Sequence, residues 1–314
     1  MLRSPPRYSD PNLPPLDEQD RKLIQALMAD GRASGRELAQ HTGISEANVS
    51  RRLARLLEEK SIRIAGFVPP EILGLEVQFV TFMRCKGSVD EAAATLVPHP
   101  EIAWLSGLFG QWDLVGYGVV QDTVALNEFI DRAIRGNPHF RTVQTEVVLA
   151  FEGSGRHAET RKVHREVDAS DRLIIREVQR DGRASFTDIA QHTGISATSA
   201  ADRFRRLVND GTLQIMTIPD PTRVDKLLSG SLGFRLSGPI AEVMPRLRAF
   251  EEVAFLSTST GPCPIRSEFH VRGEREMDAM RNALLAIPGV EDVEISIYRR
   301  LYKQTFEWLA PPAK

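Results

Sequence analysis

Two stretches of the chain combine arginines with small polar side chains in a pattern suited to nucleic acid. In the first stretch, Asn48 is followed by the pair Arg51 and Arg52, with Arg55 close behind. An asparagine amide can form two hydrogen bonds with adenine, and an arginine can bind guanine or a backbone phosphate. The candidate DNA-contacting residues of this stretch are Ser45, Glu46, Asn48, Ser50, Arg51, Arg52 and Arg55.

The second stretch lies 151 positions further along the chain and repeats the theme with different residues. Its arginines at 203 and 206 are equivalent to those at 52 and 55. The candidate DNA-contacting residues here are Ser196, Thr198, Ser199, Arg203, Arg205 and Arg206. A run of charged residues is also typical of a solvated helix face, so the interpretation depends on the surrounding elements.

The residues before each stretch predict a helix-turn-helix. In the first copy, Asp17 is a suitable N-cap for one helix and Gly31 ends it. Ser34–Glu37 forms a capping box for a second short helix, and Thr42–Ile44 forms a tight turn before a third helix capped by Ser45. The major groove of DNA admits one helix, whose N-terminal residues reach the base edges. We therefore expect the third helices to contact DNA.

The whole module is duplicated. Asp30–Ser34 returns as Asp181–Ser185, and Ala39–Ser45 returns as Ala190–Ser196. The shift of 151 residues is far longer than a solenoid repeat, which indicates two fused copies of one module. A function that needs a symmetric dimer of single modules can therefore be carried by this chain alone.

A second type of domain is predicted after each helix-turn-helix. The pattern of strands and helices predicts the order βαββαβ, a ferredoxin-like domain. In the first copy we expect strands at 77–84, 102–106, 113–120 and 142–151, with helices at 90–96 and 123–135. In the second copy the corresponding segments are 231–236, 240–250, 253–258, 266–272, 274–286 and 290–302. Segments 62–68 and 213–218 are predicted as short β-segments that serve as a wing or a connector.

The predicted fold class is α+β, with two winged helix-turn-helix domains and two ferredoxin-like domains in tandem. The expected boundaries are a flexible arm at 1–16, helix-turn-helix domains at 17–68 and 168–219, ferredoxin-like domains at 69–152 and 220–304, a linker at 153–167 and a tail at 305–314. Trp104 and its equivalent Phe255 lie in strand patterns and are expected in the core.

Composition narrows the class of protein. The net charge of −2 gives no global argument for nucleic-acid binding, so that argument must be local. Cys85 and Cys263 have no metal-ligand spacing, no apolar run is long enough for a membrane span, and the N-terminus has no secretory pattern. We expect a cytoplasmic protein with no metal, no cofactor and no membrane partner.

The loop from Gly107 to Asp113 is the candidate effector site. Its glycines, Gly107 and Gly110, allow backbone N–H groups to approach a ligand, and Asp113 could hold an ammonium group. A plain hairpin turn would explain the same residues. In the second copy Gly261 replaces Gly110, but Pro264 stands where Asp113 would be, and prolines remove backbone donors. The second loop is therefore a degenerate version of the first.

The order of these motifs resembles the leucine-responsive regulator/asparagine regulator (Lrp/AsnC) family of prokaryotic transcription factors. The residues that carry the resemblance are Leu16–Asp20, Asp30–Ser34, Gly43–Ser45, Arg51–Arg55, Gly107–Asp113 and Ile287–Val290. It covers roughly 16–151 and 167–303, although family members usually carry one copy per chain. In the family the ferredoxin-like domain, called RAM, dimerises face to face and binds amino acids or related small effectors at the interface.

The resemblance implies a sequence-specific regulator that binds double-stranded DNA and responds to a small effector. A single ferredoxin-like sheet buries one face under its helices and needs a cover for the other, so we also expect a pseudo-dimer of RAM domains, formed within the chain or with a second chain. Assembly into a homodimer or larger homo-oligomer is expected as well. An enzyme on the same scaffold is the alternative, because sirohaem decarboxylases resemble this family. Their pattern includes histidines on RAM strands, whereas 103–120 and 253–269 contain none and only His270 comes close. A scaffold without DNA binding is a third possibility. No catalytic motif is present, so no catalytic residue is predicted.

Overall fold

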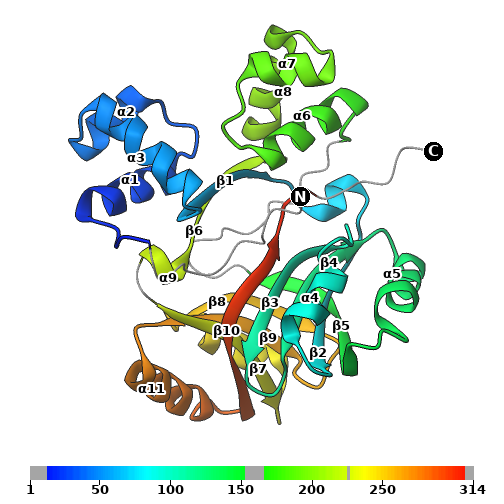
Figure 1. Cartoon of the computed structure of the whole chain (residues 1–314). Coiled ribbons are helices and arrows are strands. Elements are labelled where there is room, and N and C mark those ends of the chain that lie inside the picture. Colours follow the sequence, from blue (N-terminus) through cyan, green and yellow to red (C-terminus); the bar gives the residue numbers. More distant parts are fainter. Residues whose placement is uncertain (1–12, 153–165, 225–226, 308–314) are drawn as a thin grey trace. The chain divides into compact units, whose positions relative to one another are not determined.

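The computed structural model describes residues 13–152, 166–224 and 227–307. These residues form two compact units, and each unit contains segments from both copies of the module (Figure 1). We call them the barrel unit (75–152 and 227–304) and the helical unit (13–74, 166–224 and 305–307). Most of the predicted arm at 1–16, linker at 153–167 and tail at 305–314 lies outside the described residues.

The helical unit holds both helix-turn-helix copies. Its first copy contains α1 (Glu18–Ala29), α2 (Gly35–Thr42), α3 (Glu46–Glu58), β1 (Ile62–Phe67) and η1 (Pro70–Leu73). Its second copy contains α6 (Ala169–Arg180), α7 (Phe186–Thr193), α8 (Ala197–Asn209), β6 (Gln214–Pro219) and α9 (Pro221–Val224).

Local side-chain chemistry sets the ends of these helices. The carboxylates of Asp17 and Asp168 accept hydrogen bonds from backbone N–H groups in the first turns of α1 and α6. Gly43 and Gly194 end α2 and α7 with positive φ values of 72° and 73°, a conformation that glycine adopts without strain. The turn before each third helix is therefore built in the same way in both copies.

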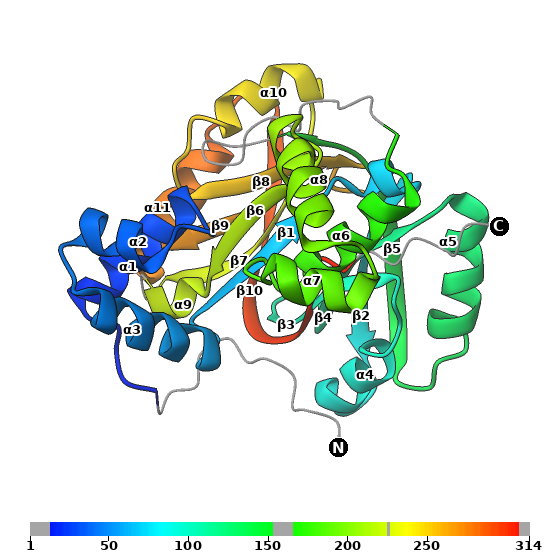
Figure 2. The same cartoon turned by 90° about the horizontal axis from the view of Figure 1, so that it is seen from above.

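The short strands after the helices do not fold back as wings. β1 pairs with β6 in an antiparallel two-stranded sheet, from Ile62 opposite Pro219 to Phe67 opposite Gln214. Figure 2 shows these two strands side by side between the helices of the first copy and those of the second. Strand pairing between the copies satisfies backbone groups that a wing would have satisfied within one copy. Of the two roles expected for these segments, wing or connector, the structure shows a connector that both copies share.

The barrel unit contains both ferredoxin-like copies. The first copy comprises β2 (Val77–Cys85), α4 (Val89–Leu96), β3 (Ile102–Phe109), β4 (Leu114–Val120), α5 (Thr123–Phe129), the π-helix η2 (Ile130–Ile134) and β5 (Phe140–Glu152). The second copy comprises β7 (Leu228–Leu236), α10 (Ile240–Leu247), β8 (Val253–Ser259), β9 (Ile265–Val271), α11 (Glu274–Leu285) and β10 (Val290–Gln304).

The eight strands form one closed barrel in the order β10-β3-β4-β2-β5-β8-β9-β7. Two seams join the copies, β5 with β8 and β3 with β10, and both are antiparallel. Closure leaves neither ferredoxin-like sheet with a free edge, because each copy's last strand pairs with the other copy. The copies therefore form a pseudo-dimer within one chain, joined at strand edges.

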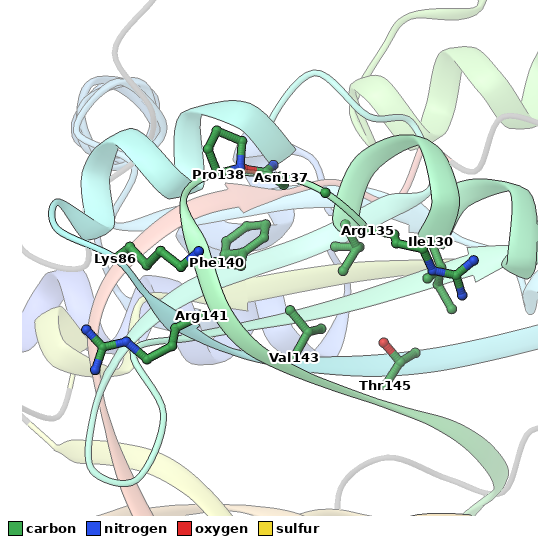
Figure 3. Close-up of a pocket in the computed structure, with 11 residues that line it drawn as sticks. Lys86, Ile130, Arg135, Asn137, Pro138, Phe140, Arg141, Val143 and Thr145 are labelled. Atoms are coloured by element: carbon green, nitrogen blue, oxygen red, sulfur yellow. The ribbon is translucent and has the colours of Figure 1, made fainter.

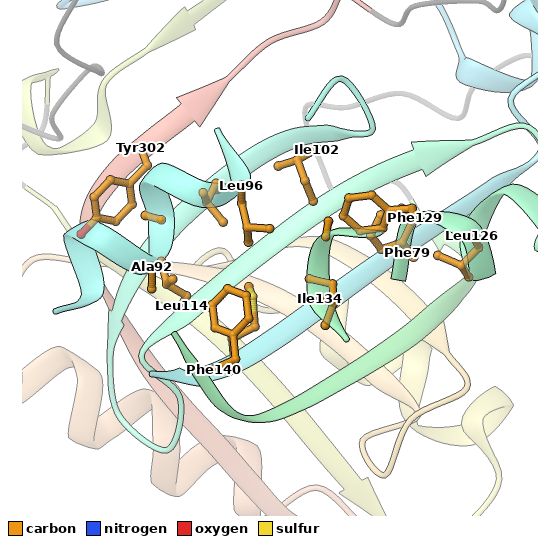
Figure 4. Packing of buried hydrophobic residues seen from close by; sticks show 14 of the residues in the cluster. Phe79, Ala92, Leu96, Ile102, Leu114, Leu126, Phe129, Ile134, Phe140 and Tyr302 are labelled. Carbon is orange, nitrogen blue, oxygen red and sulfur yellow. The ribbon is translucent and has the colours of Figure 1, made fainter. Parts of the chain in front are cut away.

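Helices cover the outer faces of the barrel strands. In the first copy, α4, α5 and η2 pack on a buried apolar cluster in which the rings of Phe79 and Phe129 lie 5.3 Å apart (Figure 4). An equivalent cluster in the second copy includes Phe234 and Phe269, both fully buried. Since alternate residues of a strand face opposite sides, the remaining side chains face the barrel interior.

The interior differs between its two halves. Phe82, Leu108, Trp112 and Val115 form a small apolar cluster there. Beside it Arg266 pairs with Glu146 across the two copies at 2.6 Å, and both side chains are almost fully buried. The guanidinium of Arg266 also lies 4.4 Å from the centre of the Phe82 ring. A charged contact between the copies thus lies beside an apolar cluster of the first copy.

Two residue placements differ from the sequence-based expectation. Phe255, expected in the core beside its equivalent Trp104, is 40% exposed and has a φ of 51°. The irregular register of β8 near this residue turns its side chain outward, whereas Trp104 packs against Tyr298. Gly107, expected in a loop, lies within β3, which continues to Phe109.

Candidate nucleic-acid interface

The N-terminal half of α3 presents a polar face. Glu46, Ser50 and Arg51 are exposed, while Val49 is buried against the other helices. Asn48 is half-buried, and its side-chain oxygen accepts a 2.7 Å hydrogen bond from the Arg51 guanidinium. This bond orients two side chains that can both form bidentate contacts with base edges.

The equivalent face of α8 has smaller side chains, and Asp202 stands at the position of Arg51. Thr198, Arg205 and Arg206 are exposed, and the hydroxyl of Ser196 accepts from the Ser199 N–H at 3.2 Å. Arg205 forms an exposed ion pair with Asp202 at 2.6 Å. Such a pair is easily exchanged for another partner, because exposed ion pairs contribute at most about 1 kcal/mol.

Arg52 and Arg203, which were grouped with the DNA-contacting residues, are held inside their own domains. Arg52 donates to Asp17 at 2.8 Å and to the buried Asp20 at 2.7 Å. Arg203 forms the same contacts with Asp168 at 2.6 Å and Asp171 at 2.9 Å. The hydrogen bond with Asp20 raises the pKa of Arg52 above its ordinary value.

These two arginines therefore anchor each third helix to the first helix of its own copy. The sequence signal for this role was an aspartate pair spaced by three residues at the start of each first helix, Asp17 with Asp20 and Asp168 with Asp171. The pair supplies the N-cap and a buried carboxylate together, and the arginine bridges both.

The second equivalent pair of arginines behaves differently in the two copies. Arg55 donates to Asp20 at 2.6 Å and is about one-third exposed. Arg206 is exposed and forms no ion pair with another residue of the described ranges. The positive charge available to solvent on α8 is therefore carried by Arg205 and Arg206, and on α3 mainly by Arg51.

A reciprocal contact that the sequence analysis missed joins the two helix-turn-helix copies. The Arg32 guanidinium donates to the carbonyl oxygens of Gly182 and Ala184, both at 2.8 Å. The Arg183 guanidinium donates to those of Gly31 and Ala33 at 2.6 Å and 2.9 Å. We call this set the arginine clasp. The signal was the repeated segment itself, because both halves of the clasp come from the duplicated Asp-Gly-Arg-Ala-Ser.

Aromatic rings and a backbone hydrogen bond add to the contact that the arginine clasp makes. Arg32 lies 4.8 Å and 5.1 Å from the ring centres of Phe204 and Phe186, close enough for cation–π attraction. Burial lowers the pKa of both clasp arginines below their ordinary values. The N–H of Gly182 also donates to the carbonyl of Ile64 in β1 at 3.0 Å. The two helix-turn-helix copies are thus bound to each other directly as well as through β1 and β6.

Of the expected effector residues, Gly107 and Gly110 lie against β10 of the second copy, whereas Asp113 contacts residues of its own copy. The Asp113 carboxylate accepts from the Cys85 N–H at 2.8 Å, with Arg84 at 4.0 Å. Gly110 has a φ of 150°, and a Cβ added there would lie 2.6 Å from the Ser296 hydroxyl of β10. In the structure the Asp113 carboxylate binds the backbone N–H of Cys85, and Gly110 allows close approach of the second copy.

Neither cysteine is suited to nucleophilic chemistry. Burial raises the pKa of Cys85 to about 11 and that of Cys263 to about 12, so both thiols stay protonated at neutral pH. In the described part of the chain, no group of three or more His, Cys, Asp or Glu side chains could hold a metal ion. Within the same residues, no helix combines the length and apolar character needed to cross a bilayer.

Comparisons with known proteins agree with this architecture. The AsnC-type helix-turn-helix domain matches residues 16–57 and 167–208, and the Lrp/AsnC ligand binding domain matches residues 79–156. In fold, 92% of this chain matches 93% of the siroheme decarboxylase NirDL in its crystal structure, with a TM-score of 0.63 and 14% identity. At that identity the likeness concerns the fold alone.

Two curated relatives each align with less than half of this chain. The HTH-type transcriptional regulator FL11 of Pyrococcus horikoshii is 32% identical over 137 residues, which are 43% of this chain and 90% of the relative. The HTH-type transcriptional regulator Ptr1 of Methanocaldococcus jannaschii is 35% identical over 123 residues, or 38% and 82% of the two chains. The chain therefore belongs to the Lrp/AsnC family, with the family's helix-turn-helix domain present twice.

Proposed function

We propose that this protein is a sequence-specific transcriptional regulator whose two unequal helix-turn-helix copies bind one asymmetric operator. The observation that carries the proposal is the presence of two third helices with exposed polar faces, α3 and α8, in one compact unit. A dimeric regulator binds two half-sites with two such helices, and here one chain supplies both.

Base contacts are assigned mainly to the first copy. Asn48 and Arg51 are already hydrogen-bonded to each other on the polar face of α3. Their equivalents in the second copy are Ser199 and Asp202, which offer less to a base edge. Each bidentate base contact contributes about 1–3 kcal/mol of discrimination, enough to make the half-sites differ.

Phosphate contacts are assigned to both copies. Arg205 and Arg206 on α8 are exposed, and the Arg205 pair with Asp202 is weak enough to open for a phosphate. Backbone N–H groups at the starts of α3 and α8 can add further phosphate contacts. Arg52 and Arg203 are assigned a positioning role, because their donors already serve the aspartates of α1 and α6.

The experiment is footprinting on an operator selected from random duplexes, at several salt concentrations. Asn48→Ala with Arg51→Ala should abolish sequence preference at one half-site, while Ser199→Ala with Asp202→Ala is the matched control in the second copy. The logarithm of affinity should fall against the logarithm of salt with a slope of about −0.9 for each phosphate neutralised. Equal loss at both half-sites, or a slope near zero, would contradict the proposal.

A small effector and further assembly complete the proposed function. The match to the Lrp/AsnC ligand binding domain supports an effector bound by the barrel unit. We expect assembly into a homodimer or larger homo-oligomer, which light scattering on the intact chain would measure. The enzyme alternative is tested by reconstitution with a tetrapyrrole, since a haem-like absorption band would favour it.

A further inference from the structure

A pocket of about 550 Å³ lies in the first copy of the barrel unit, between η2 and the beginning of β5 (Figure 3). Its apolar lining includes Ile130, Ile134, Phe140 and Val143. This volume falls within the range of pockets that hold small molecules in proteins. The pocket lies between secondary-structure elements on the helix-covered face, and Asp113 is not one of its lining residues.

Three basic side chains lie beside the apolar lining of the pocket. Lys86, Arg135 and Arg141 all line the pocket, and all three side chains are exposed. Among the described residues that line it, none is acidic. Asp131 pairs with Arg135 one turn away along the helix, and exposed pairs of this kind are weak. The local charge therefore favours an anionic ligand.

The neutral polar side chains of the pocket are already engaged. The Asn137 amide donates to the Thr95 hydroxyl and to the Ala133 carbonyl, both at 3.1 Å. The Thr145 hydroxyl lies 3.1 Å from that of Thr81, within hydrogen-bond distance. What the pocket offers a ligand is thus an apolar surface and a positively charged rim.

The backbone at this place departs from regular helix. The Arg135 N–H donates to the Ile130 carbonyl at 2.7 Å, five residues back, so the end of the helix is a π-turn. The equivalent helix of the second copy, α11, is α-helical from Glu274 to Leu285. Single π-turns are rare and occur frequently at functional sites.

The second copy also lacks the charges. Strand pairing sets the correspondence, because Cys85 lies opposite Phe140 as Leu236 lies opposite Val290. At the positions equivalent to the three cations, the second copy has Ser237, Leu285 and Glu291. The duplication therefore provides an internal comparison, in which the π-turn and the positive rim occur together in one copy.

We propose that the pocket between η2 and β5 binds a small organic anion with one carboxylate and a short apolar body. A zwitterionic amino acid fits less well, because no carboxylate lines the pocket to balance an ammonium group. This pocket is a candidate site for the effector of the proposed regulator. Carboxylate binding itself does not depend on the proposed function, whereas an effect of the carboxylate on DNA binding does.

Binding is tested by titration calorimetry on the full-length protein with isovalerate, 4-methylpentanoate and phenylacetate. The neutral isovaleramide and zwitterionic leucine serve as probes of charge. At least one carboxylate should bind, while isovaleramide and leucine bind about tenfold more weakly or not at all. Absence of binding by all three carboxylates at about 10 mM, or equal binding of isovaleramide, would overturn the proposal.

The site is located by giving the first copy the residues of the second. Lys86→Ser with Arg141→Glu should weaken carboxylate binding about tenfold or more, with an unchanged melting temperature. Arg281→Ala, which removes an exposed cation from α11, should leave binding unchanged. Equal affinity of the double variant and the parent would overturn the assignment, and Arg135→Leu provides an independent second variant.

A DNA-binding measurement separates this inference from the proposed function. A bound carboxylate should change operator affinity in the parent and leave it unchanged in the Lys86→Ser, Arg141→Glu variant. Loss of carboxylate binding alone contradicts the pocket, whereas carboxylate binding without any operator binding contradicts the regulator. Operator binding that ignores a bound carboxylate would overturn the effector role while leaving the site in place.

Discussion

The helical unit and the barrel unit join the two copies in different ways. In the helical unit the contact is reciprocal, since Arg32 and Arg183 each bind the carbonyls of the other copy. In the barrel unit the two strand seams are reciprocal as well, but the buried ion pair is one-sided, since Glu146 pairs with Arg266 while the equivalent positions hold Ser296 and Val115. In a homodimer every contact occurs twice, but a fused chain needs each contact only once. The reciprocal side-chain contact is thus the one between the helix-turn-helix copies, whereas the buried ion pair of the barrel occurs once.

The largest expected effect is in the barrel. Arg266→Ala leaves the Glu146 carboxylate buried without its partner, which should lower the free energy of unfolding by about 3–5 kcal/mol. Glu146→Gln with Arg266→Met removes both charges and should cost less. Chemical denaturation of both variants measures the difference. A loss below about 1 kcal/mol for Arg266→Ala would mean that water or another cation reaches Glu146.

The next effect concerns the two glycines beside the clasp. A Cβ at Gly182 would lie 2.8 Å from the backbone nitrogen of Ala65, while one at Gly31 would meet side-chain atoms of Ile215 and Thr217 at 2.8 Å and 3.1 Å. Side chains can move where backbone cannot, so Gly182→Ala should cost about 1–3 kcal/mol and Gly31→Ala less. Thermal unfolding compares the pair, and the opposite order would show that β1 yields more easily than the side chains on β6.

The third effect concerns Glu268, a titratable residue whose equivalent in the first copy is Tyr117. Burial raises the pKa of Glu268 to about 7, although Tyr298 donates to it. Its folded pKa lies above its unfolded pKa, so the folded state holds the proton more tightly. The contribution of Glu268 to the free energy of unfolding should therefore be complete below about pH 4.5. It should be lost as the pH rises through 7, by about 1–2 kcal/mol for this half-buried side chain. Glu268→Gln should remove that slope, and an unchanged slope would place the titrating group elsewhere.

The smallest effect separates the two halves of the clasp. Arg32 lies over Phe186 and Phe204, and no such ring contact accompanies Arg183 within the described residues. Arg32→Ala should therefore destabilise the helical unit by about 0.5–1 kcal/mol more than Arg183→Ala. Both variants should broaden the range of half-site spacings that the protein accepts, as measured on operators with inserted base pairs. Unchanged spacing preference in the double variant would show that β1 and β6 suffice.

Features set by neighbouring residues could be predicted from the sequence. The caps at Asp17 and Ser34 and the turn at Gly43 depend on side chains within a few residues of one another, and they occur where expected. The βαββαβ order follows from local alternation of polar and apolar residues. The duplicated module also indicated that the two copies could pair.

Features that join distant segments could not be predicted in this way. Arg52 lies on a helix face whether its partner is Asp20 or a phosphate, and only the tertiary fold brings Asp20 to it. The seams of the barrel depend on which strand edges meet, and alternation along a strand does not encode that choice. Segment 123–135 has a helical composition throughout, so its π-helical end at Ile130–Ile134 left no signal.

The two barrel seams determine the ratio in which the two different copies of the module are paired. Because β5 pairs with β8 and β3 with β10 inside one polypeptide, pairing of a first copy with a second copy is an intramolecular step. Its equilibrium does not depend on protein concentration, unlike that of two separately made subunits. Each molecule made in the cell carries one copy of each kind in a fixed ratio, even when only a few molecules are present.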